Sequence, residues 1–139
     1  MQVIQFTLID EEIRHNSYSH VTKRENSVIY VSTHDSCTGM SWLESLDPDT
    51  KKVVLDYLDH TYNHHHPMTN LFKYMADQPA NTVIISLWDV LRLGKNGRVN
   101  TPGTTGKHNW SLRIRNYLTL YCQGKKLKGI ADKSGRNAR

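Results

Sequence analysis

The fold of this chain is decided by the stretch Asn26-Ser27-Val28-Ile29-Tyr30-Val31-Ser32-Thr33-His34-Asp35. Its middle is an almost continuous run of apolar, mostly β-branched residues, which is typical of a strand buried on both faces of a parallel sheet. The run ends in an imidazole and a carboxylate. Barrel enzymes carry their active sites at the carboxyl ends of parallel strands. The stretch therefore predicts an α/β fold with a functional site at this strand end.

Two more strands and three helices are expected around this strand. Residues 2–9 and 82–87 have the short, β-branched pattern of strands, and residues 10–25 are polar. Asp47-Pro48 predicts a helix start, because Asp caps free amides and Pro fits the first helical turn. A second helix is expected over 67–76. Helices between strands imply a parallel sheet with right-handed crossovers. The apolar face of a third helix is expected to be Trp110, Ile114, Tyr117, Leu118 and Tyr121.

The length and the cysteine content limit the class of protein. The chain has 139 residues, enough for one modest domain, whereas a complete eight-stranded barrel takes about 250. Two cysteines, Cys37 and Cys122, make no disulfide framework, which favours a reducing compartment. No apolar run is long enough to cross a bilayer, and the first residues lack the pattern of a signal peptide. We therefore expect no membrane partner.

Positive charge is concentrated at the carboxyl end. Residues 123–139 hold six bases and one acid, which accounts for the whole formal net charge of +5. A basic tail of this composition predicts disorder. The rest of the chain is formally neutral, so binding of nucleic acid by the tail is the least favoured function.

The first candidate site is formed by His34 and Asp35, with Trp42 following at a short distance. Neighbouring residues at a strand end point in different directions, so we expect the two side chains not to pair but to reach into one cleft. There the carboxylate could stabilise positive charge or bind a hydroxyl group, and the imidazole could bind a second hydroxyl, while Trp42 would offer a flat apolar face. A capping Asp and an internally bonded His at the start of a loop remain the alternative.

The second candidate site follows the third strand, which ends at Trp88-Asp89. Arg98 and Asn100 offer hydrogen-bond donors, and Pro102 with the nearby glycines lets the backbone fold tightly beside a ligand. An ordinary surface loop is the alternative. His64-His65-His66 cannot converge on one ion from a helix and fit a solvated helix end, so neither a metal nor a cofactor is expected.

Together the two sites resemble a known enzyme family. Residues 26–35 followed by Trp42 resemble the pattern N-S-V-x-Y-x-G-T-H-D…W of the 4-α-glucanotransferases, the amylomaltases and plant disproportionating enzymes of glycoside hydrolase family 77. Residues 88–94, 98–104 and 109–113 resemble the family's Q-D-x-L-x-L-G…R-M-N-x-P-G-T…N-W-x-W-R. Residues 1–6 and His15-Asn16 also resemble family segments, so the likeness extends roughly to residue 121 in one order.

The resemblance implies that residues 1–122 are the C-terminal third of a catalytic (β/α)8 TIM barrel, namely its strands six to eight. It implies transfer of α-1,4-glucan segments between maltooligosaccharides by a retaining mechanism. Asp35 corresponds to the family's stabiliser of the transition state. The nucleophilic aspartate and the acid/base glutamate lie on earlier strands in the family, so the chain alone is expected to be inactive. The implied substrate contacts are His34, Trp42, Asp89, Arg98, Asn100 and Pro102.

The chain departs from the family pattern near this site. Ser36-Cys37 replaces Asn-Asp, Trp88 replaces Gln, Val99 replaces Met and Leu112 replaces the second Trp of the last motif. These departures fit either a divergent member of the family or a decaying gene.

The expected partners follow from the same reasoning. An α-1,4-glucan or maltooligosaccharide is the expected ligand, and a slice of a barrel would expose two strand edges that recruit an N-terminal barrel fragment or a second copy. The alternative is a non-catalytic glucan-binding remnant or a degenerate remnant of that enzyme. The expected location is the cytoplasm, or a plastid if the chain comes from a plant.

Overall fold

The computed structural model describes residues 1–8, 25–115 and 117–136. The strands β1 (Gln2–Val3), β2 (Val28–Tyr30) and β3 (Thr82–Ile84) form one parallel sheet in the order β1-β2-β3. Ile29 lies between its register partners Gln2 and Val83. The predicted parallel sheet is confirmed, with β2 as its central strand. Most of the polar stretch over 10–25 and the match at His15-Asn16 fall outside the described residues.

The first strand is much shorter than predicted. After Val3 the chain turns into helix α1 (Ile4–Thr7), and the Leu8 amide donates to the Ile4 carbonyl oxygen at 2.9 Å. This single turn brings Ile4 and Leu8 into the core, both fully buried, and leaves Phe6 74% exposed. A continued strand would put all three on one face. The prediction of a strand to residue 9 is therefore wrong, because the helical turn separates Phe6 from its apolar neighbours.

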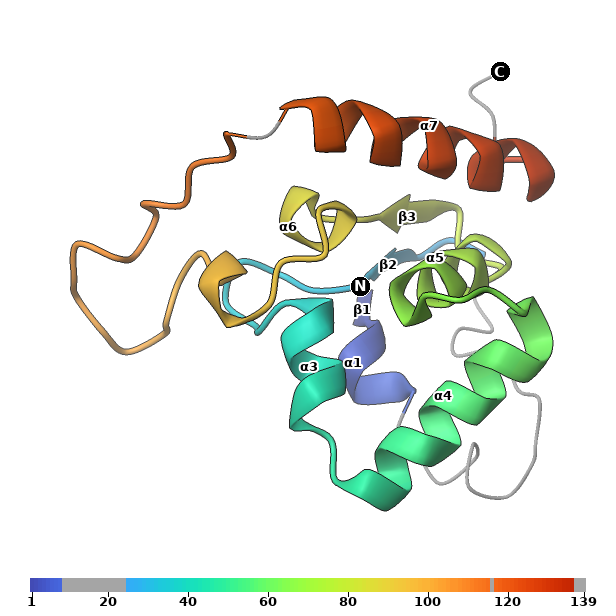
Figure 1. Cartoon of the computed structure of the whole chain (residues 1–139), viewed down its shortest axis with the longest axis horizontal. Helices are drawn as coiled ribbons and strands as arrows, with labels where there is room; N and C mark the ends of the chain where they lie inside the picture. The colour runs from blue at the N-terminus through green and yellow to red at the C-terminus, as the bar shows by residue number, and fades with distance from the viewer. Residues whose placement is uncertain (9–24, 116, 137–139) are drawn as a thin grey trace.

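The third strand also ends early. β3 stops at Ile84, and Leu87, the last residue of the predicted strand, already begins helix α6 (Leu87–Val90). A single 3-10 turn, η1 (Lys95–Gly97), follows before the long loop that leads to the last helix. This loop extends away from the sheet and the other helices before it reaches α7 (Figure 1).

Three helices connect β2 to β3: α3 (Gly39–Ser45), α4 (Pro48–Tyr62) and α5 (Pro67–Ala76). The Asp47 carboxylate accepts from the Thr50 amide at 3.0 Å and caps α4 as predicted. The bounds predicted for α5 are confirmed as well. α4 ends at Asn63 in the left-handed region, with φ of 40°. The two prolines and the cap thus fix both helices locally.

The core lies between the central strand and these helices. Its members are buried apolar side chains that touch one another: Ile29, Val31, Trp42, Leu43, Leu58, Met68, Leu71 and Met75, with others around them. Fully burying a side chain of this size contributes about 1.5–3 kcal/mol. Among the described residues, no helix is long and apolar enough to cross a membrane.

The carboxyl end differs most from the prediction. Residues 110–115 are not helical, and the last helix, α7, spans Tyr117–Lys133. Its predicted apolar face is exposed at Tyr117, Leu118 and Tyr121, by 62–75%. Instead Leu127 and Ile130, one turn apart in the basic segment, pack against the core. The prediction of a disordered tail is therefore wrong as far as Arg136, because this apolar pair docks α7 beside α5 (Figure 1).

A guanidinium group anchors the end of α7. Arg136 donates to the carbonyl oxygens of Ala76 at 2.5 Å and Ala80 at 2.8 Å, and also to that of Gln78. The last carbonyls of a helix lack intrahelical partners and carry partial negative charge. Arg136 therefore ties the end of α7 to the C-terminal end of α5.

Candidate functional site

A tight turn presents the predicted pair at the end of the central strand. The Thr33 amide donates to the Ser36 hydroxyl at 2.9 Å, and the Ser36 amide donates to the Thr33 carbonyl oxygen at 3.3 Å. The turn leaves the side chains of His34 and Asp35 50% and 48% exposed. Both groups are therefore fixed through their backbone and open to a ligand.

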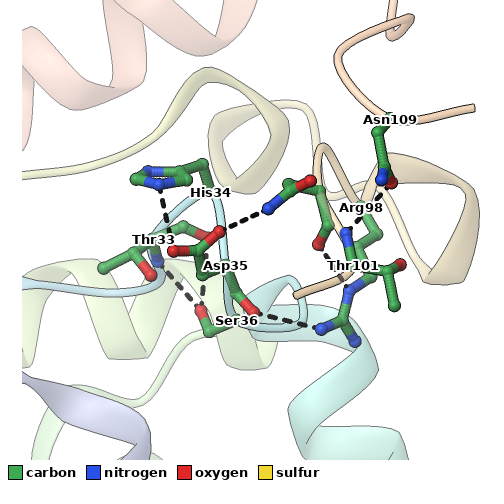
Figure 2. Close-up of polar contacts among 8 residues, drawn as sticks. Thr33, His34, Asp35, Ser36, Arg98, Thr101 and Asn109 are labelled. Atoms are coloured by element: carbon green, nitrogen blue, oxygen red, sulfur yellow. Dashed lines mark hydrogen bonds and ion pairs between the residues drawn. The ribbon is translucent and has the colours of Figure 1, made fainter. Parts of the chain in front are cut away.

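His34 and Asp35 lie against each other. Their Nε2 and Oδ2 atoms are 3.1 Å apart (Figure 2). The prediction that the two side chains would not pair is wrong, because the chain has already left the strand and the Thr33–Ser36 turn brings both to one side. The Trp110 ring lies 5.1 Å from the imidazole, centroid to centroid, and covers it on another side.

The loop after η1 meets this turn. The Asn100 side-chain amide donates to Asp35 Oδ1 at 2.6 Å, and the Asn100 backbone amide donates to the His34 carbonyl oxygen at 3.1 Å. Arg98 reaches across and donates from Nη2 to the Asp35 carbonyl oxygen at 3.0 Å (Figure 2). The two sequence segments predicted to share a site therefore do converge. Asn100 also holds one carboxylate oxygen in a fixed direction.

Arg98 acts as a brace within this loop. Besides the bond to Asp35, its Nε donates to the Asn100 carbonyl oxygen at 2.9 Å. Both bonds go to the backbone, and the exposed guanidinium keeps other N–H groups for a ligand. Arg98 thus orders the segment that carries Asn100.

Pro102 lies in an exposed turn that Asn109 closes. Asn109 accepts from the Thr101 amide at 3.1 Å and donates to the Thr104 carbonyl oxygen at 3.0 Å. Sequence reasoning did not select Asn109 as a site residue, although it opens the last matched motif. It shapes the loop beside the site instead of facing the Asp35 carboxylate.

Asp89 is fully buried, which contradicts its predicted contact with substrate. Its carboxylate accepts from the Gly39 amide at 2.7 Å and from the Ser32 hydroxyl. Burial raises the pKa of Asp89, while these two hydrogen bonds oppose that rise. Ser32 in turn accepts from Trp88 Nε1 at 2.8 Å. Asp89 therefore joins the end of β2 to the start of α3 behind the site.

Trp42 is buried as well, with 5% of its surface exposed. It packs in the core from α3 and offers no face to a sugar, so this prediction is also wrong. The exposed aromatic ring near the site is Trp110, which is 60% exposed. The signal for it was present in the matched motif at 109–113, but Trp110 was assigned to a helix face.

The run His64-His65-His66 forms the connection between α4 and α5. His64 and His66 lie between α4 and α5, where His66 Nδ1 accepts from the Met68 amide at 3.2 Å and so caps α5. Within the described ranges, no three His, Cys, Asp or Glu side chains are grouped so as to hold a metal ion.

Comparison with known proteins shows which family the chain resembles. A family model described as 4-alpha-glucanotransferase matches residues 1–119. The chloroplastic/amyloplastic 4-alpha-glucanotransferase of Solanum tuberosum is 34% identical over 98% of this chain and 23% of that protein. The 4-alpha-glucanotransferase of Aquifex aeolicus is 32% identical over 93% of this chain and 26% of that protein.

A solved structure has the same fold. The amylomaltase of Streptococcus agalactiae, determined in complex with acarbose, superimposes with a TM-score of 0.79 over 99% of this chain and 27% of that one, at 24% identity. The chain thus spans about a quarter of the length of the relatives it matches. With a family model that matches most of its residues, the chain belongs to the 4-alpha-glucanotransferase family, glycoside hydrolase family 77.

Proposed function

We propose that this chain carries the sugar-holding part of a 4-α-glucanotransferase active site, with Asp35 as the stabiliser of the transition state. The observation that carries the proposal is the hydrogen bond of 2.6 Å from the Asn100 amide to the Asp35 carboxylate. It joins the two sequence motifs of the family at one exposed point. The proposed substrate is an α-1,4-glucan or maltooligosaccharide.

The chemistry fits a carboxylate held in this way. A retaining glycosyl transfer passes through a transition state in which the sugar ring carries positive charge. A negative group oriented in advance stabilises such charge without having to reorganise during the reaction. Asn100 fixes one oxygen of Asp35, and the exposed outer side of the carboxylate stays open to a sugar. Arg98 supplies further donors to sugar hydroxyls, and the His34 ring nitrogen that does not face Asp35 offers another hydrogen-bonding group.

A complete reaction needs two more carboxylates, a nucleophile and an acid/base. We propose that the three parallel strands are strands six to eight of a (β/α)8 barrel and that the two groups come from its other strands. Within the described residues β1 and β3 each pair with β2 alone, which supports this, and Phe6 just after β1 and Ile84 in β3 are 74% and 39% exposed. The 139 residues alone should bind sugar without turning it over.

A chimaeric enzyme tests this proposal. Residues 1–119 replace the aligned segment of the A. aeolicus 4-alpha-glucanotransferase, and maltotriose is followed by chromatography for glucose and longer oligomers. We expect disproportionation, and a loss of about 100-fold or more in kcat for Asp35→Asn, the scale of removing one preorganised electrostatic group. Asp56→Asn, an exposed acid on α4, is the matched control and should leave the rate unchanged.

Two results would contradict the proposal. One is a folded, active chimaera whose rate does not depend on Asp35. The other is robust disproportionation by the 139-residue chain alone, which would mean that a bond-breaking pair lies within it.

A second candidate function is binding of glucan without catalysis. The Trp110 ring favours it, since the ring is 60% exposed beside His34 and offers a flat face for a sugar. Titration of maltoheptaose into the chain should then quench tryptophan fluorescence, and Trp110→Ala should abolish that binding. A chimaera that binds maltoheptaose but never transfers glucose would favour this candidate over the enzyme.

The location of the protein stays a prediction. We propose the cytoplasm, or a plastid for a plant chain, and the plastid relative from Solanum tuberosum supports the second possibility.

A further inference from the structure

A separate pocket lies between α5 and α7, and it shares no residue with the Asp35 site. Its volume is about 440 Å³. Small-molecule sites are commonly clefts of about 300–1,000 Å³. The pocket exists because Leu127 and Ile130 dock α7 onto the core, which leaves the basic side of that helix along its rim.

Three lysines line this pocket. Lys126 and Lys133 stand two turns apart on α7, so they lie along one face of the helix, and Lys73 comes from α5. Lys73 Nζ donates to the Tyr62 carbonyl oxygen at 3.0 Å. Among the described residues, none of the three lysines has a carboxylate within ion-pair distance. The positive charge on this rim is therefore not neutralised within the described part of the chain.

The acid in the pocket does not cancel this charge. Asp77 lines it too, and the pKa of the nearby Tyr62 hydroxyl is raised first by burial and then by the Asp77 charge. Three lysines against one carboxylate leave a net positive lining. A cleft lined by one sign of charge focuses the field and attracts ligands of the opposite sign.

Arg92 adds a further positive charge near the pocket, although it does not line it. Its Nη2 donates to the Thr69 hydroxyl oxygen at 3.0 Å, while its Nε is buried and has no hydrogen-bond partner among the described residues. The pKa of the His64 imidazole at the rim is lowered, first by burial and then by Lys73 and other cations. A neutral imidazole at the rim adds a hydrogen-bonding group without further charge.

The uncharged polar residues that line the pocket suit a polyhydroxylated ligand. His64 Nδ1 accepts from the His66 amide at 3.2 Å, so the neutral ring carries its proton on Nε2 and can donate it to a ligand. The Thr69 hydroxyl accepts from Arg92 and keeps its own hydrogen to donate. The Tyr62 ring, which also lines the pocket, lies edge-on to Tyr74 at 76° and 6.3 Å.

We propose that the pocket between α5 and α7 binds a small phosphate monoester of the sugar-phosphate class. Its phosphate group lies on the ammonium groups of Lys126 and Lys133, and its hydroxyls face His64 and Thr69. Lysine binds phosphate as a point charge with rotatable donors. Because two of the pocket's lysines belong to α7, bound ligand also holds this helix against α5.

Calorimetric titration of the full chain tests the proposal, with glucose 6-phosphate, inorganic phosphate and glucose as probes. We expect glucose 6-phosphate to bind more tightly than inorganic phosphate, and glucose not to bind here. Lys126→Gln and Lys133→Gln should each weaken glucose 6-phosphate by about threefold or more, the upper range for one partly exposed charge. Circular dichroism checks that each variant is folded.

Lys125→Gln is the matched control, since Lys125 lies on the same helix, has the same charge and does not line the pocket. Equal weakening by Lys125→Gln would overturn the proposal in favour of diffuse attraction. No binding of glucose 6-phosphate at roughly 10 mM would overturn it as well, since that corresponds to a negligible affinity. Tighter binding of a single-stranded oligo-deoxythymidine through the same two lysines would overturn it in favour of nucleic acid.

Discussion

Asp89 gives the sharpest test of how this site is built, because the same residue was expected to contact substrate and is found fully buried. Replacing it with alanine removes the acceptor for the Gly39 amide and for the Ser32 hydroxyl. A buried donor left without a partner costs about 1–3 kcal/mol. Two such donors suggest a loss of about 2–6 kcal/mol in the free energy of unfolding. The net loss is smaller, because burying the carboxylate, which raises its pKa, itself costs free energy that the alanine variant no longer has to supply.

We therefore expect Asp89→Ala to lower the free energy of unfolding by about 2–5 kcal/mol, a large part of the 5–15 kcal/mol typical of a domain. Urea unfolding of the full chain, followed by circular dichroism, measures it. With a slope of about 1–3 kcal/mol per molar urea, the midpoint should fall by roughly 1–2 M or the chain should fail to fold.

Two variants make this test specific. Asp89→Asn keeps an acceptor for the Gly39 amide and should recover part of the loss. Asp35→Ala removes a half-exposed carboxylate and should cost less than about 1 kcal/mol. A loss below about 1 kcal/mol for Asp89→Ala, or an equal loss for Asp35→Ala, would refute the structural role of Asp89.

Three further predictions concern pH, the last helix and one helix end. Burial raises the folded-state pKa of Asp89 above 3.8, so the stability gained from its protonation is full below pH 3.8 and is lost as pH rises through the folded pKa. Asp89→Asn should flatten this part of the curve of stability against pH. An unchanged curve would contradict the prediction. Arg136→Ala should free α7 from the carbonyls of residues 76–80 at a cost of about 1.5–3 kcal/mol in stability. Hydrogen exchange of the α7 amides should accelerate in this variant and less so in Arg136→Lys. Equal protection of these amides in the original chain and in Arg136→Ala would argue against the anchor. Asn63 has a φ of 40°, in the left-handed region that glycine tolerates best. Asn63→Ala should therefore lower the free energy of unfolding by about 1 kcal/mol, measured by thermal unfolding, while Asn63→Gly should leave it nearly unchanged. Equal effects of the two variants would show that the left-handed turn carries no strain.

The helices after the central strand show what local sequence can determine. Asp47-Pro48 begins α4, and Pro67 begins α5, where the structure has them. The caps and prolines act within one turn of chain, so their effect does not depend on the rest of the fold. The parallel order of the strands was predicted in the same way, from helices that separate them.

The candidate site was predictable only in part. The family motifs indicated that the segments at residues 33–36 and 98–104 meet, and Asn100 at 2.6 Å from Asp35 bears this out. The pairing of His34 with Asp35 was not predictable, because it depends on where the strand ends and the turn begins. A difference of one residue in that position redirects both side chains.

Burial was decided by tertiary structure alone. Trp42 and Asp89 each follow a strand end as an exposed site residue would, yet both are covered, because Gly39, Ser32 and the core helices come from other parts of the chain. The basic end of the chain is similar, since the short apolar pair Leu127 and Ile130 has little effect until α5 and β3 give it a surface to pack on. The sequence by itself determined the family, the parallel strands and the local helix starts. Tertiary structure determined which of its polar and aromatic groups face a ligand, since exposure depends on distant neighbours that no local pattern encodes.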